Sequence, residues 1–109
     1  MKREKAIKIY NELKAKCPGL ILAGSAVRNS SGSKGEDIND LDMIWVGKIF
    51  PMHLLPIGDM EKGSVTVRYP NILRFMYKGE MVDIHRTGKA NLSKTKLHLT
   101  GPYVTLESK

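Results

Sequence analysis

Three aspartates have the spacing and the surroundings that metal-dependent chemistry requires. Asp40 and Asp42 stand two residues apart at the start of an apolar run, and Asp83 lies inside another apolar run. Side chains two residues apart in a strand point to the same face, so Asp40 and Asp42 should project together. Neighbouring carboxylates repel each other and lose hydration, so a fold must compensate them. Mg²⁺ prefers oxygen ligands, and these three residues therefore predict a magnesium site.

A turn after residues 20–23 offers a second polar group. Gly24 permits a sharp turn and a close approach of the backbone. Ser25 is expected to cap a short helix that carries Val27 and Arg28. The free N–H groups of such a helix could hold phosphate, and Arg28 could add a bidentate contact. The alternative is an ordinary capped turn with a solvated arginine, but the acidic pair downstream favours phosphate binding.

The elements that must position these groups follow from periodicity and turn signals. An amphipathic helix is predicted over Arg3–Lys16, ended by Pro18-Gly19. Residues 47–57 should be irregular, and residues 87–96 should form a loop that leads into a short helix. The tail from residue 97 onward shows only the turn signal Gly101-Pro102. The predicted strands are residues 20–23, 40–46 and 64–69, and a hairpin of 72–77 with 80–85 around Lys78-Gly79.

These elements predict a single α+β domain over residues 1–109, with a mixed or antiparallel sheet of about four to five strands flanked by helices. The formal net charge is +7, which favours an anionic partner such as nucleic acid or nucleotides; a generically basic, well-solvated surface is the alternative, and the charge alone separates the two only weakly. The single cysteine, Cys17, excludes a disulfide within one chain and is expected to be a small buried side chain. No secretory signal core or membrane-spanning run is visible, so we expect a cytoplasmic protein or a viral or phage product acting inside its host cell.

Taken together, these motifs resemble the catalytic palm of polymerase-beta-like nucleotidyltransferases, and more narrowly of family X DNA polymerases. That palm carries a strand ending in Gly-Ser, an Arg three residues after the Ser, a strand opening Asp-x-Asp, and a third Asp in an apolar-Asp-Ile-Arg strand. The residues that fill these places are Gly24, Ser25, Arg28, Asp40, Asp42 and Asp83. Arg3-Glu4 resembles the family's Arg-Glu at the start of the preceding helix, and Thr100-Gly101 resembles its Thr-Gly pair.

The chain also departs from the family pattern. The loop before Asp40 is longer than usual, His85 stands where Arg is common, and Leu106 occupies the position of a base-contacting Asn. The family usually has further modules that grip DNA. A protein partner that supplies such modules is therefore an expectation.

The resemblance implies repair-type or gap-filling DNA synthesis with two Mg²⁺ ions, for which Mn²⁺ can substitute. Asp40 and Asp42 would bridge both ions, and Asp83 would bind the catalytic ion and accept the proton of the attacking 3′-hydroxyl. The incoming dNTP would be bound by Arg3, Gly24, Ser25, Arg28, Thr100 and Gly101. A DNA primer-template or gapped DNA would meet the basic residues Arg74, Lys78, Arg86, Lys94 and Lys96.

Three other interpretations stay open. The same chemistry could place a nucleotide on a protein, an RNA end or a small molecule. The chain could be a palm that binds nucleic acid without catalysis. It could also be a basic α/β domain whose acidic pair is structural.

Overall fold

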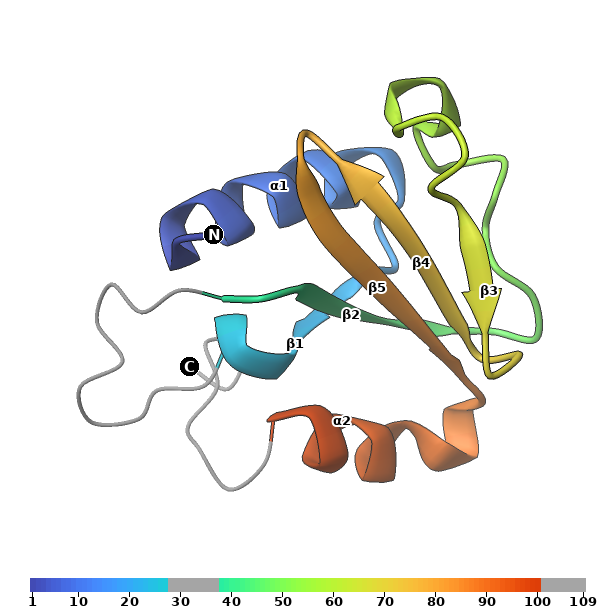
Figure 1. Cartoon of the computed structure of the whole chain (residues 1–109). Coiled ribbons are helices and arrows are strands. Elements are labelled where there is room, and N and C mark those ends of the chain that lie inside the picture. Colours follow the sequence, from blue (N-terminus) through green and yellow to red (C-terminus); the bar gives the residue numbers. More distant parts are fainter. Residues whose placement is uncertain (28–37, 101–109) are drawn as a thin grey trace.

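The computed structural model describes residues 1–27 and 38–100 (Figure 1). Arg28 and Gly101, both expected at the nucleotide, lie outside the described residues. The elements of the described part run in the order α1 (Arg3–Lys16), β1 (Ile21–Ala23), η1 (Gly24–Ala26), β2 (Leu41–Val46), η2 (Ile57–Asp59), β3 (Thr66–Arg68), β4 (Ile72–Tyr77), β5 (Glu80–Thr87), η3 (Lys89–Asn91) and α2 (Leu92–Thr100).

The strands form one mixed five-stranded sheet in the order β1-β2-β5-β4-β3. β2 and β5 are parallel, and the other neighbouring pairs are antiparallel. The β4–β5 hairpin turns at Lys78-Gly79, where both residues have positive φ. The predicted α+β class, helix α1 and hairpin are confirmed.

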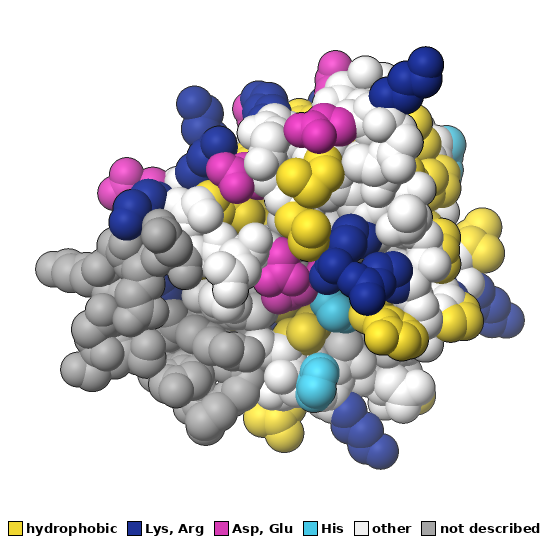
Figure 2. All heavy atoms as spheres, in the orientation of Figure 1, with side chains coloured by type: hydrophobic (Ala, Val, Ile, Leu, Met, Phe, Trp, Pro, Cys, Tyr) yellow, Lys and Arg dark blue, Asp and Glu magenta, His cyan; other side chains and the backbone are white. Residues whose placement is uncertain are grey.

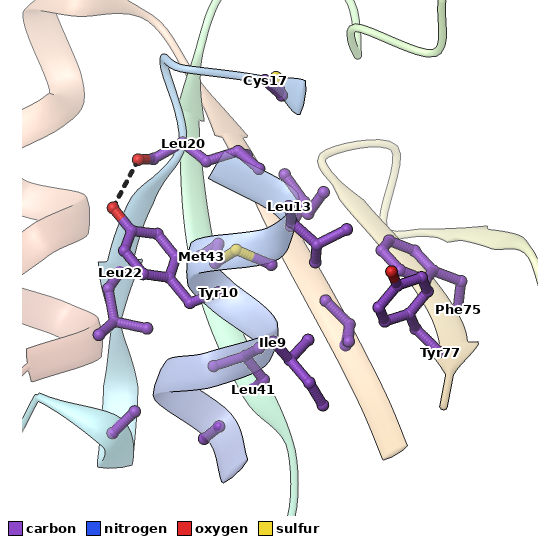
Figure 3. Close-up of a cluster of buried hydrophobic side chains, with 14 of the residues drawn as sticks. Ile9, Tyr10, Leu13, Cys17, Leu20, Leu22, Leu41, Met43, Phe75 and Tyr77 are labelled. Atoms are coloured by element: carbon purple, nitrogen blue, oxygen red, sulfur yellow. Dashed lines mark hydrogen bonds between the residues drawn. The ribbon is translucent and has the colours of Figure 1, made fainter. Parts of the chain in front are cut away.

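Helix α1 packs on one face of the sheet and forms the main core. Ile9 and Leu13 meet the alternate strand residues Leu41, Met43 and Ile84, all almost fully buried. The Tyr10 hydroxyl donates to the Leu20 carbonyl at 2.9 Å, which joins the helix to the entry of β1 (Figure 3). Cys17 is fully buried in this core, as expected. The pKa of its thiol is raised, because the effect of burial exceeds the opposing effect of a backbone hydrogen bond at Gly19.

The other face of the sheet is only partly covered by helix. Leu99 of α2 forms a small cluster with Ala23 of β1 and Ile44 of β2, and Leu92 packs against it. Asp42 is paired with Ala23 and stands two residues from Ile44, so it lies beside this cluster on the same face. The α2 cluster thus borders the acidic part of the sheet.

Two local predictions were wrong. Residues 92–100 are helical, so the helix is longer than the expected short helix and continues into the segment assigned to the tail. Ser25 does not cap a helix, because η1 starts at Gly24 and its N-cap residue is Ala23, without a side-chain cap bond. No helix among the described residues combines the length and the apolar character needed to span a membrane.

Candidate metal and phosphate site

The register of the parallel pair β2–β5 brings two of the predicted aspartates together. Asp42 is the direct partner of Asp83 in this pair. Asp40 comes just before β2, and the Arg74 guanidinium that binds Asp83 also lies close to the Asp40 carboxylate. The three carboxyl groups therefore converge on the sheet face that α1 does not cover. Figure 2 shows acidic, basic and histidine side chains gathered near the centre of one face.

Arg74 of β4 neutralises the most buried of these carboxylates. Its Nε donates to Asp83 Oδ1 at 2.7 Å, and a terminal nitrogen donates to Asp83 Oδ2 at 2.8 Å. The same guanidinium lies 3.8 Å from Asp40 Oδ2. Asp83 is only 4% exposed, so this bidentate pair supplies the compensation that a buried carboxylate needs.

His85 stands beside Asp42 in the same cluster. Its Nε2 lies 3.1 Å from Asp42 Oδ1. An ionised carboxylate can only accept, so a hydrogen bond here requires the proton on Nε2. Ligand atoms of Asp42, Asp83 and His85 all lie within 4.8 Å of one another.

Their surroundings raise the pKa of Asp40 and lower the pKa of Asp83. Burial, repulsion from Asp42 and the hydrogen bond and repulsion from Asp83 raise the pKa of Asp40 to about 6, against the attraction of Arg74. Burial would raise the pKa of Asp83 as well. The hydrogen bond from Arg74, assisted by Asp40 and by attraction to Arg74 and His85, holds the pKa of Asp83 below its usual range.

The Gly24-Ser25 turn lies directly against the acidic cluster. Gly24 has a φ of +69°, and a Cβ built there would stand 2.5 Å from Asp42 Oδ2, so glycine is required for both reasons. Ser25 is exposed at the surface of the turn. Arg3 at the start of α1 donates from Nε to the carbonyl of Ala26 at 2.9 Å, which places it beside the same turn.

The end of α2 reaches this region as well. Leu99 packs on Ala23, the residue before Gly24, so the backbone of Thr100 lies close to the turn. The described residues that the resemblance assigns to the nucleotide therefore gather around one end of β1.

The basic residues expected at nucleic acid are spread over the molecule. Arg74 faces the carboxylates. Lys78 binds Glu12 of α1 at 2.6 Å, on the opposite side of the sheet from the acidic cluster. A terminal nitrogen of Arg86 donates to Asn71 Oδ1 at 2.9 Å. Lys94 is exposed on α2, and Lys96 is partly buried there.

The residues of the cluster fit a divalent cation. Carboxylate oxygens are the donors that Mg²⁺ and Mn²⁺ prefer, and the imidazole of His85 adds a donor suited to Zn²⁺ and other later transition metals. Asp83 is already bound by Arg74 through both oxygens, but each oxygen keeps a further lone pair. Asp42 and Asp40 are partly exposed, and Asp42 lies against the turn.

The sequence interpretation missed the roles of Arg74 and His85. A hairpin with the two-residue turn Lys78-Gly79 pairs Tyr77 with Glu80, and counting back from there pairs Arg74 with Asp83. The pairing of Arg74 with Asp83 could therefore have been predicted from the sequence. The His85–Asp42 contact depends on the long-range β2–β5 pairing, which the local pattern does not encode.

Comparison of this chain with protein-family models, with curated proteins and with solved structures finds no match. The functional argument is therefore built on the geometry of the cluster and on the motifs.

Proposed function

We propose that this protein is a nucleotidyltransferase that adds a deoxynucleotide from a dNTP to the 3′-hydroxyl of a DNA primer. The observation that carries the proposal is the register that sets Asp42 beside Asp83, with Asp40 adjacent and the Gly24-Ser25 turn against Asp42. A cation held by these carboxylates would stand beside a turn that can approach phosphate, which is the combination that phosphoryl transfer requires.

One group of residues would bind the phosphates, and a second group would hold the metal ion. Arg3, the backbone of the Gly24-Ser25 turn and the Ser25 hydroxyl bind the β- and γ-phosphates and neutralise the charge that develops on the leaving group. Asp40, Asp42 and Asp83 would hold Mg²⁺, which when bound would stabilise the charge of the reacting phosphate and increase the acidity of the 3′-hydroxyl. The hydroxyl oxygen bonds to the α-phosphorus while the bond to the bridging oxygen breaks, and pyrophosphate leaves.

The proton of the 3′-hydroxyl would go to a carboxylate of the cluster, and the resemblance assigns it to Asp83. Without a cation, Arg74 lowers the pKa of Asp83, whereas burial and the neighbouring carboxylates raise the pKa of Asp40 to about 6. A bound divalent ion lowers the pKa of every carboxylate that it contacts.

A second candidate function has one observation in its favour. Arg74 and His85 already compensate Asp83 and Asp42 without a cation. A palm that binds nucleic acid without catalysis would need no more than this. The two candidates differ in whether the cluster binds divalent ions.

Single-nucleotide extension of a labelled primer on gapped DNA with Mg²⁺ tests the proposal. The parent protein should extend the primer, and Asp42→Asn should reduce the rate by at least about a hundredfold, because a charge that stabilises the transition state is lost. Asp59→Asn is the matched control, since Asp59 is exposed in η2, outside the acidic cluster, and the variant should extend as the parent does. Equal extension by Asp42→Asn and the parent would remove the carboxylate from the reaction, and transfer to RNA or protein but not to DNA would change the acceptor.

A further inference from the structure

A pocket whose lining includes several polar side chains opens next to the acidic cluster. It has a volume of about 430 Å³, within the range of small-ligand sites. It shares His85 with the cluster, and His85 contacts Asp42 directly. Its lining includes Tyr69, Asn71, His85, Arg86, Asn91 and Thr95.

One wall of the pocket is an exposed aromatic ring. Tyr69 is 73% exposed, although tyrosine rings are usually largely buried. The guanidinium of Arg68 lies 5.7 Å from the centre of this ring, so the aromatic surface carries a positive charge beside it. An exposed aromatic next to arginine is the combination on which nucleic-acid bases stack.

Other residues that line the pocket are polar and hydrogen-bonded to one another. Arg86 is fixed by Asn71, which accepts from its guanidinium at 2.9 Å and from its backbone N–H at 2.7 Å. On α2, the Thr95 hydroxyl is held against Thr87 at 3.2 Å and against the Asn91 carbonyl at 3.1 Å. These polar groups can form hydrogen bonds with a ligand bound beside Tyr69, and the nearby arginines complement phosphate.

We infer that this pocket binds the 3′-terminal nucleotide of the acceptor strand with its base unpaired and stacked on Tyr69. The inference rests on the proposed function, because it names the acceptor of that transfer. A nucleotide held here lies beside His85 and hence next to the carboxylates that its hydroxyl must reach. The size of the pocket suits one nucleotide, and an exposed aromatic ring beside arginine is a combination that binds unpaired bases. A single-stranded 3′ end is therefore the acceptor expected to bind best, and the last base of a gapped primer must fray before it can stack on Tyr69.

Binding of short oligothymidylates, followed by fluorescence anisotropy in EDTA, tests the pocket without any chemistry. The probe carries its dye at the 5′ end, and a second probe replaces the 3′-terminal nucleotide by an abasic unit. The parent should bind the abasic probe roughly tenfold more weakly, as expected for the loss of one stacked base. Tyr69→Ala should bind both probes with the weaker affinity, and Tyr69→Phe should restore the discrimination because stacking needs only the ring.

Ile49→Ala is the matched control, since Ile49 is 79% exposed and does not line the pocket. It should discriminate between the probes as the parent does. The inference is overturned if the parent binds both probes equally, if it binds neither, or if Tyr69→Ala keeps the discrimination. Tighter binding of a blunt duplex than of the single strand would also overturn it. Because no metal or dNTP is present, failure of nucleotide transfer and failure of this pocket are separate results.

Discussion

Asp83 is the most buried carboxylate of the cluster, and its environment is set by one arginine. The bidentate bonds from Arg74 replace the hydration that Asp83 loses on folding. Removing one partner of a buried ion pair leaves the other charge unpaired, which costs more than the pair itself contributes. Arg74 is therefore expected to matter for stability as well as for the charge of the site.

The substitution Arg74→Met tests this pairing. We expect a loss of roughly 2 kcal/mol in the free energy of unfolding, below the range for fully buried pairs because the Arg74 side chain is 28% exposed. The double variant Arg74→Met with Asp83→Leu should recover most of that loss, since no unpaired charge remains. Urea unfolding of the three proteins in EDTA gives the comparison. If Arg74→Met were as stable as the parent, the Arg74–Asp83 pair would make no net contribution to the free energy of unfolding.

Asp40 predicts a distinct dependence of stability on pH. Its pKa rises from 3.8 to about 6 on folding, so in this window the folded state holds a proton that the unfolded chain has released. The free energy of unfolding in EDTA should therefore fall as the pH rises from about 4 to 6. Asp83 acts in the other direction, because its lowered pKa contributes stability that is lost only as the pH falls below 3.8.

Asp40→Asn separates the two contributions. Asparagine keeps the site neutral at this position, so the fall in stability between pH 4 and 6 should flatten and the variant should be more stable than the parent at neutral pH. The acid loss due to Asp83 should remain. Denaturant melts at a series of pH values measure both effects. A variant whose profile parallels the parent's would show that Asp40 is not held in a charged, buried environment.

At the scale of elements, the turn between β1 and η1 is the tightest constraint on the site. Gly24 has positive φ and leaves no space for a Cβ beside the Asp42 carboxylate. Gly63 also has a φ of +78°, but a Cβ built there meets nothing within 4 Å. The two glycines therefore separate backbone strain from crowding of the acidic cluster.

Alanine at each glycine gives the matched comparison. Gly63→Ala should cost about 1 kcal/mol of stability, the penalty for an ordinary residue in the left-handed region. Gly24→Ala should cost more, and it should also weaken Mn²⁺ binding because Asp42 must move. Thermal melts and a Mn²⁺ titration measure the two effects. Equal losses in the two variants, with unchanged Mn²⁺ binding, would contradict the contact between the turn and Asp42.

The elements themselves were largely predictable, for a local reason. The stripe of Ala6, Ile9, Tyr10 and Leu13 sets helix α1, and alternation with a two-residue turn sets the β4–β5 hairpin. Helix α2 was predicted too short because Ser, Thr and Lys dominate residues 92–100, and its stability depends on packing of Leu92 and Leu99 against the sheet.

At the scale of the whole molecule, the decisive feature is the parallel pairing of β2 with β5. These strands are separated by two others in the sequence, and their pairing closes the distance between Asp42 and Asp83. The aspartates could be singled out from their apolar surroundings, but their convergence could not be derived from local patterns. His85 acquires its contact with Asp42 only once this pairing is made, whereas the Arg74–Asp83 pair already follows from the local β4–β5 hairpin.

The central claim is that Asp40, Asp42 and Asp83 hold divalent ions together with a nucleoside triphosphate. Electron paramagnetic resonance of free Mn²⁺, in the presence of a non-hydrolysable dNTP analogue, counts the ions that the protein binds. The account predicts about two Mn²⁺ ions in each complex of protein and analogue, one of which the analogue also binds when it is alone, and a clear reduction in Asp42→Asn. A parent protein that binds no more Mn²⁺ than the free analogue would contradict it.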